Sequence, residues 1–104
     1  MLASELAFLT PNQLEALDPL GADVALNVSS LHEMTTEQAA RYLELIDRHA
    51  SGGFFYTKQW RLWQNPLDGV VAARESYPYP ERWRAVFDRV HPVQVRFFEA
   101  LFAL

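Results

Sequence analysis

Hydrophobic and polar residues follow two different patterns in the middle of the chain. Residues 23–29 hold a short, nearly continuous apolar run between turn signals, which is typical of a strand buried on both faces. Residues 36–50 carry apolar side chains at helical spacing, behind a capping-box sequence formed by Thr35 and Gln38. Residues 53–60 are aromatic and β-branched and predict a second strand. The sequence therefore predicts a strand–helix–strand unit whose two strands are parallel.

The C-terminal part of the chain is less regular. Pro66 and Gly69 mark a turn, and residues 77–80 are expected to be extended, because each proline moves its predecessor out of the helical region. Residues 83–90 fit both a strand and a helix. Residues 93–102 follow a His-Pro connector and begin with a clean alternation, so we favour strands and predict a C-terminal β-hairpin. The predicted fold class is α/β, with one βαβ unit plus this hairpin.

Composition and charge exclude several functional classes. The 104 residues suit one small domain, and half of them are hydrophobic, which is typical of a globular protein. The net charge is -4 without any run of Lys or Arg, so we expect neither a nucleic acid nor a membrane as partner. The absence of cysteine excludes disulfides and thiolate metal sites and fits a cytoplasmic location. No His/Asp/Glu spacing indicates a metal site, and we expect none.

The most polar part of the predicted unit lies where its first strand ends. Ligands of open α/β sheets bind beyond the carboxyl ends of the strands. There, His32 is a candidate general base, because imidazole titrates near neutral pH. Ser29 and Ser30 are candidate hydrogen-bond donors, and Glu33 is a candidate to bind a hydroxyl or amine group of a ligand, or to orient His32. In the structural alternative, the serines only end the strand and Glu33 only favours the helix dipole.

The second strand supplies the other candidate substrate-binding residues. Tyr56, Lys58 and Trp60 share one of its faces by alternation, and in the functional interpretation that face closes a pocket with His32. In the alternative interpretation they are ordinary packing and a solvated lysine. The four glycines form neither G-x-G-x-x-G nor a P-loop, so we expect no cofactor-binding residues in this chain.

Three segments together resemble a known family, the sugar O-methyltransferases of the class I S-adenosylmethionine-dependent methyltransferases. They are Asp23-Val-Ala-Leu-Asn-Val-Ser-Ser-Leu-His-Glu-Met34, Tyr42-x-x-x-Ile46 and Gly53-Phe-Phe-Tyr56. In that family a strand ending in Ser-(Leu/Phe)-x-Glu-Met leads into a helix with Tyr-x-x-x-Ile and a strand ending in Phe-Tyr. Tyr79-Pro-x-x-Trp83 and Phe98-Glu-Ala-Leu101 are similar to its last strands. The resemblance covers roughly residues 8–104, and Ser-x-x-Glu-Met is its most specific element.

The resemblance implies a partial, Rossmann-like methyltransferase sheet from the fourth strand onward. It places the substrate side of a pocket at Ser30, His32 and Glu33. The family's cofactor loop belongs to an earlier half, and Lys58-Gln59 stands where the family often carries Asn. We therefore expect residues 1–104 to form an incomplete domain that is inactive alone. It would bind S-adenosylmethionine only when the missing half is supplied.

A half-sheet leaves its first strand, residues 24–28, without a neighbour on one side. We expect a homodimer, or a partner chain, to cover this edge. Three functions follow from these considerations: an inactive fragment, a methyltransferase assembled from two chains, and a non-catalytic dimeric module that binds a small polar ligand between strand ends.

Overall fold

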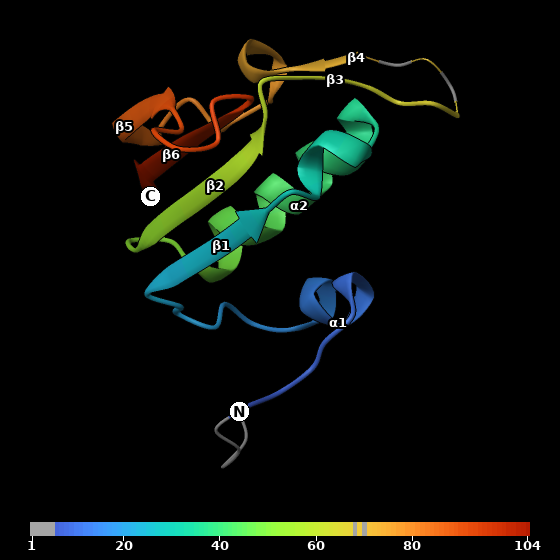
Figure 1. The fold of residues 1–104 in the computed structure, drawn as a ribbon. Coiled ribbons are helices and arrows are strands. Elements are labelled where there is room, and N and C mark those ends of the chain that lie inside the picture. Colours follow the sequence, from blue (N-terminus) through green and yellow to red (C-terminus); the bar gives the residue numbers. More distant parts are fainter. Residues whose placement is uncertain (1–5, 68, 70) are drawn as a thin grey trace.

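The computed structural model describes residues 6–67, 69 and 71–104 (Figure 1). The first elements along the chain are α1 (Pro11–Ala16), β1 (Val24–Val28), the 3-10 turn η1 (Leu31–Glu33) and α2 (Thr36–His49). They are followed by β2 (Phe54–Trp60), β3 (Leu62–Gln64), β4 (Val71–Ala73), the 3-10 turn η2 (Arg74–Ser76), β5 (Arg84–Val90) and β6 (Phe97–Ala103). The result is a mixed α/β fold.

Four strands form the central sheet in the order β1-β2-β6-β5. β1 and β2 are parallel and joined through α2, so the predicted βαβ unit is confirmed. β6 is antiparallel to both of its neighbours, and β5 therefore runs in the same direction as β1 and β2. Three strand ends and the start of β6 meet at one edge of the sheet, which we call the carboxyl edge (residues 29–33, 60–62 and 90–97).

The predicted C-terminal hairpin is present, because β5 and β6 are adjacent and antiparallel. Residues 93–96, expected as the beginning of the last strand, instead form a turn before β6. In this turn, His91 Nδ1 accepts hydrogen bonds from the backbone N–H groups of Val93, at 3.2 Å, and Gln94, at 3.0 Å. β3 and β4 form a second, separate hairpin that the sequence did not predict.

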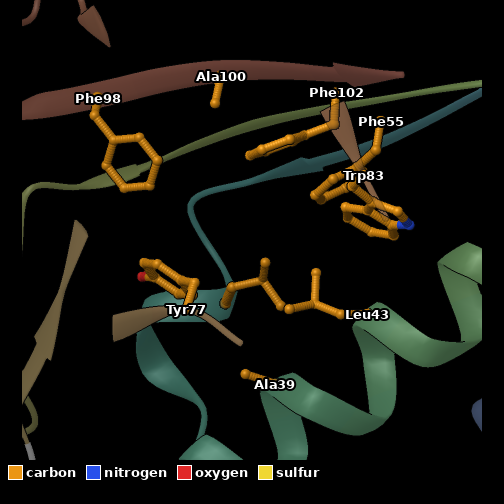
Figure 2. Close-up of a cluster of buried hydrophobic side chains, with 9 residues drawn as sticks. Ala39, Leu43, Phe55, Tyr77, Trp83, Phe98, Ala100 and Phe102 are labelled. Atoms are coloured by element: carbon orange, nitrogen blue, oxygen red, sulfur yellow. The ribbon is translucent and has the colours of Figure 1, made fainter. Parts of the chain in front are cut away.

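Helix α2 covers one face of the sheet and encloses an aromatic core between them. Figure 2 shows Ala39 and Leu43 of α2 opposite Phe98 and Ala100 of β6. The capping box that starts this helix is formed as predicted. The buried core comprises Leu31, Ala39, Leu43, Phe55, Tyr77, Trp83, Phe98, Ala100 and Phe102. Burying this much ring surface on one side is the main source of stability for so small a domain.

The opposite face of β1 and β2 is not covered by any helix among the described residues (Figure 1). There Val24, Leu26 and Val28 are 55%, 69% and 53% exposed, and Phe54 is 44% exposed. The prediction that the first strand is buried on both faces is therefore wrong. β1 is an edge strand, and only one layer lies against it. We call Val24, Leu26, Val28 and Phe54 the open face.

Polar contacts hold α1 against α2. Arg41 of α2 forms an ion pair with Glu15 of α1, with Nε 2.6 Å from Oε1. The buried ring of His49 donates from Nε2 to the carbonyl of Leu14, at 2.7 Å, and accepts the N–H of Leu20 at Nδ1, at 3.2 Å. None of the helices in the described part of the chain is both long and apolar enough to span a membrane.

Candidate functional site

A buried network of polar side chains lies where β1 and β2 end. Its centre is Gln59, which is fully buried. The Oε1 atom of Gln59 accepts the backbone N–H groups of Ser30, at 3.1 Å, and His32, at 3.4 Å. Its Nε2 donates to the carbonyl and Oδ1 of Asn27, at 3.2 and 2.8 Å, and to Oγ1 of Thr57, at 3.0 Å. We call these five residues the Gln59 network. It fixes the end of β1 to β2.

The Gln59 network determines which nitrogen of His32 carries the proton. The Gln59 amide is oriented by backbone groups, because the N–H of Ser30 can only donate and the carbonyl of Asn27 can only accept. Gln59 Oε1 lies 3.0 Å from His32 Nδ1, so Nδ1 is the donor. In the neutral ring, Nε2 then holds a lone pair, which is the form that a general base requires.

Access to the His32 ring is restricted. The side chain is 3% exposed, and its ring packs against Trp63 with the ring centres 5.2 Å apart. The indole Nε1 of Trp63 is buried and has no hydrogen-bond partner among the described residues. A ligand therefore reaches the Nε2 atom of His32 only if Trp63 or another neighbour moves.

Ser29 and Glu33 are at the surface, next to the Gln59 network. Ser29 has a left-handed backbone with φ of 56°, and its N–H continues the parallel ladder to the carbonyl of Lys58, at 2.7 Å. Glu33 lines a cavity of about 300 Å³ together with Trp63 and residues 65–67. Both side chains are accessible to a ligand that binds at the carboxyl edge.

Tyr56, Lys58 and Trp60 lie on the other face of β2. Strand alternation turns them away from Thr57 and Gln59 and away from α2. The structure therefore does not bring these three residues into one pocket with His32, because the sheet lies between them. Trp63 connects the two sides around the end of the strand, since its ring centre is 6.0 Å from that of Trp60.

On the Tyr56 side, Glu99 of β6 collects two hydrogen bonds. Its carboxylate accepts the hydroxyl of Tyr56 at 3.0 Å and Nε of Arg89 at 3.0 Å. Burial acts to raise the pKa of Glu99, but these bonds and the charge of Arg89 outweigh it, and the pKa lies below its usual value. Burial and the bond to Glu99 raise the pKa of Tyr56. At neutral pH, Tyr56 is thus a neutral donor to an ionised carboxylate.

Lys58 and Trp60 are both held at the start of β6. The Nζ atom of Lys58 hydrogen-bonds to Oε1 of Gln94 and lies 5.2 Å from the ring centre of Phe97. The Trp60 ring packs against the same phenylalanine, with ring centres 4.8 Å apart. The ammonium group is therefore fixed beside an aromatic surface at the carboxyl edge.

Sequence reasoning missed Asn27, Thr57 and Gln59, on which the network is built. A signal was present in the strand pattern. Thr57 and Gln59 alternate with the half-buried positions of β2 and share the inward face with Phe55, where apolar side chains are the rule. Polar groups at buried positions require hydrogen-bond partners, so two in succession indicate a network.

Within the described residues, no group of three or more His, Cys, Asp or Glu side chains is placed to hold a metal ion. No protein-family model matches this chain, and no curated protein is significantly similar to it.

Proposed function

We propose that this chain is the substrate-side half of an S-adenosylmethionine-dependent methyltransferase sheet of the sugar O-methyltransferase kind, and that a cofactor-binding half completes it. One observation carries the proposal, the open face. β1 alternates exposed valine and leucine side chains on that face, while α2 buries the other face of the same sheet. Such a parallel strand, apolar on an uncovered face and unpaired at one edge, belongs in the interior of a larger α/β sheet.

The positions of the motif residues support this assignment. Residues 30–34 follow β1, residues 42–46 lie in α2, and residues 53–56 lead into β2. Of the two segments that are similar to the family's last strands, residues 79–83 directly precede β5 and residues 98–101 lie within β6. Each segment therefore lies in or beside the type of element that the resemblance implies.

The glycines of this chain do not fit a cofactor loop. A dinucleotide-type loop places glycines between a strand and the helix that follows it. The connection from β1 to α2, residues 29–35, contains none. Gly52 and Gly53 connect α2 to β2, and Gly21 and Gly69 lie in other connections, both with positive φ. We therefore propose that the cofactor binds the completing half.

In the completed protein, His32 has the proposed role of general base for a substrate hydroxyl, after Trp63 moves. Ser29, Ser30 and Glu33 have the proposed role of hydrogen-bonding the substrate. Tyr56, Lys58 and Trp60 face the side of the sheet on which the completing half is proposed to pack. They contact the substrate only if it binds on that side.

Calorimetric titration with S-adenosylmethionine tests the proposal. The chain is titrated alone and mixed with a polypeptide that carries a glycine-rich strand–turn–helix and is encoded upstream of it or in an adjacent gene. We expect saturable binding in the mixture and none by the chain alone. Leu26→Lys, on the open face, should abolish binding in the mixture. Val86→Lys, on β5 and 49% exposed, is the matched control and should leave binding intact.

Two results would contradict the proposal. Binding of S-adenosylmethionine by the chain alone would mean that the glycine argument is wrong. Failure of the mixture to bind, or equal effects of the two lysine variants, would mean that the open face does not receive a cofactor-binding half.

A second candidate function is a non-catalytic dimeric module, in which a second copy covers the open face. The same exposed residues favour it, because a two-fold interface pairs one apolar patch with its own copy. Light scattering of the chain alone separates the two candidates. A stable dimer supports the module. A monodisperse monomer with an ordinary melting transition contradicts it.

A further inference from the structure

An open cavity of about 530 Å³ lies at the carboxyl edge, beside the end of β2 and the turn before β6. Its walls come from three segments that are distant in sequence: residues 60–62, residues 73–75 and residues 95–96. The volume is within the range of small-molecule sites, and the carboxyl ends of strands are where open α/β sheets bind ligands.

Three arginines line this cavity, and main-chain hydrogen bonds fix their backbones to one another. The N–H of Arg61 donates to the carbonyl of Arg96 at 2.8 Å, and the N–H of Arg74 donates to the carbonyl of Arg61 at 3.0 Å. In addition, Nη1 of Arg61 donates to the carbonyl of Val95 at 3.1 Å. The backbone of the fold therefore places these three arginines next to one another, whatever conformations their side chains adopt.

The three guanidinium groups differ in how they are neutralised. Arg74 forms an ion pair with Asp88, at 2.6 Å, and lies 5.6 Å from the ring centre of Phe98, so it is held as part of the wall. For Arg61 and Arg96, no carboxylate of the described residues lies within ion-pair distance. Glu75 is the acidic residue of the lining. The lining of this cavity thus carries an excess of positive charge, although the net charge of the whole chain is -4.

We propose that this cavity binds a small organic oxyanion, a phosphate or carboxylate attached to a ring of about the size of a sugar. The anionic group lies between Arg61 and Arg96, because guanidinium groups bind such oxygens in a bidentate manner. The ring lies against Trp60 and Leu62, which supply the apolar wall. The site needs neither a cofactor nor a partner chain, so it stands or falls independently of the functions proposed above.

Calorimetric titration of the full chain, at low ionic strength, tests this inference. The probes are glucose 6-phosphate, benzoate and inorganic phosphate, with glucose as the neutral control. We expect glucose 6-phosphate or benzoate to bind more tightly than inorganic phosphate, and glucose not to bind. Tighter binding of glucose 6-phosphate would indicate a sugar phosphate, and tighter binding of benzoate would indicate a carboxylate on an apolar ring. Tryptophan fluorescence, to which Trp60 contributes, should change with the same midpoint, and the affinity should fall as salt is added.

Two arginine variants provide the matched pair. Arg96→Gln should weaken binding about tenfold, because it removes a charged hydrogen-bond donor from the site. Arg84→Gln makes the same change of charge at the start of β5, which is the end of that strand far from the carboxyl edge. This variant should change the affinity less than about twofold. Melting curves of both variants confirm that the fold is retained, and Arg96→Lys serves if Arg96→Gln is unstable.

Three outcomes would overturn the inference. One is binding of glucose as tight as that of glucose 6-phosphate. Another is equal weakening by Arg96→Gln and Arg84→Gln, which would indicate attraction by net charge alone. The third is the absence of saturable binding by any of the three anions up to about 10 mM, which is weaker than the affinity a formed site provides.

Discussion

Two adjacent phenylalanines of β2 report on the two faces of the sheet. Phe55 is fully buried and packs against Trp83 and Phe102, with ring centres 5.5 and 6.5 Å away. Phe54 precedes it in the same strand and is 44% exposed on the open face. The residue type and the strand are the same, so the difference comes from what covers each face. Helix α2 and the segment that carries Trp83 cover the side of Phe55, and no helix of the described residues covers the side of Phe54. The covered face contains the hydrophobic core of the domain. The open face is also apolar, but no layer of the described residues packs on it.

The largest expected effect separates these two phenylalanines. Phe55→Ala should lower the free energy of unfolding by about 3–5 kcal/mol, because it leaves a cavity in the aromatic core. Phe54→Ala should lower it by less than about 1 kcal/mol. Urea denaturation of the isolated chain measures both. If Phe55→Ala does not fold, Phe55→Leu provides a milder test with the same order of effects. Similar losses at the two positions would mean that the open face is buried in the isolated chain.

The next effect concerns the polar end of the covered face. Gln59→Leu should cost about 1–3 kcal/mol, because it leaves the backbone N–H groups of Ser30 and His32 without their acceptor and the carbonyl of Asn27 without its donor from this side chain. The exposed Gln64 of β3 is the matched control, and Gln64→Leu should stay within about 0.5 kcal/mol. The same denaturation measurement applies. A neutral Gln59→Leu would show that the network contributes no stability.

How far the sequence predicts this structure depends on the range of the interactions. β1, α2 and β2 follow from local signals: a capping box at Thr35, apolar side chains at helical spacing, and a run of aromatic residues after Gly53. The hairpin of β3 and β4 escapes prediction because three residues in each strand are too few to show alternation.

The candidate sites depend on pairings that no local pattern encodes. Gln59 meets Ser30 and His32 only because β1 and β2 pair in a particular register. The arginines of the large cavity appear scattered along the chain and become neighbours through the turn before β6. Whether a layer covers an apolar face is also a tertiary property, and this is why the burial of β1 was predicted wrongly.

A smaller, pH-dependent effect is expected from Glu99, on the uncovered side of the sheet. Its pKa is lower in the folded chain than its usual value of 4.5, so the folded state binds fewer protons than the unfolded state. The stability that Glu99 contributes is therefore fully present above about pH 4.5 and is lost as the pH falls through the lower folded value. Glu99→Gln should be less stable than the original chain at pH 7, and the difference in melting temperature should shrink toward pH 3. A constant difference would contradict this assignment.

The smallest effect on the isolated chain is expected at the open face itself. Leu26→Lys should change the free energy of unfolding by no more than about 0.5 kcal/mol, because Leu26 is 69% exposed. It should nevertheless prevent association through this face, which light scattering measures. A loss of stability as large as that of Gln59→Leu would show that Leu26 is covered within a single chain.

The place of β6 has a consequence for how the protein is made. β6 follows every other strand along the chain, yet it lies between β2 and β5 in the sheet. Its hairpin with β5 is local and forms quickly, whereas its pairing with β2 closes a long loop. Synthesis at the usual rate takes about 2–9 s to proceed from the end of β2 to the end of β6. During that interval Phe55 has no neighbouring β6 to pack on, and chaperones and aggregation compete with folding for the nascent strand.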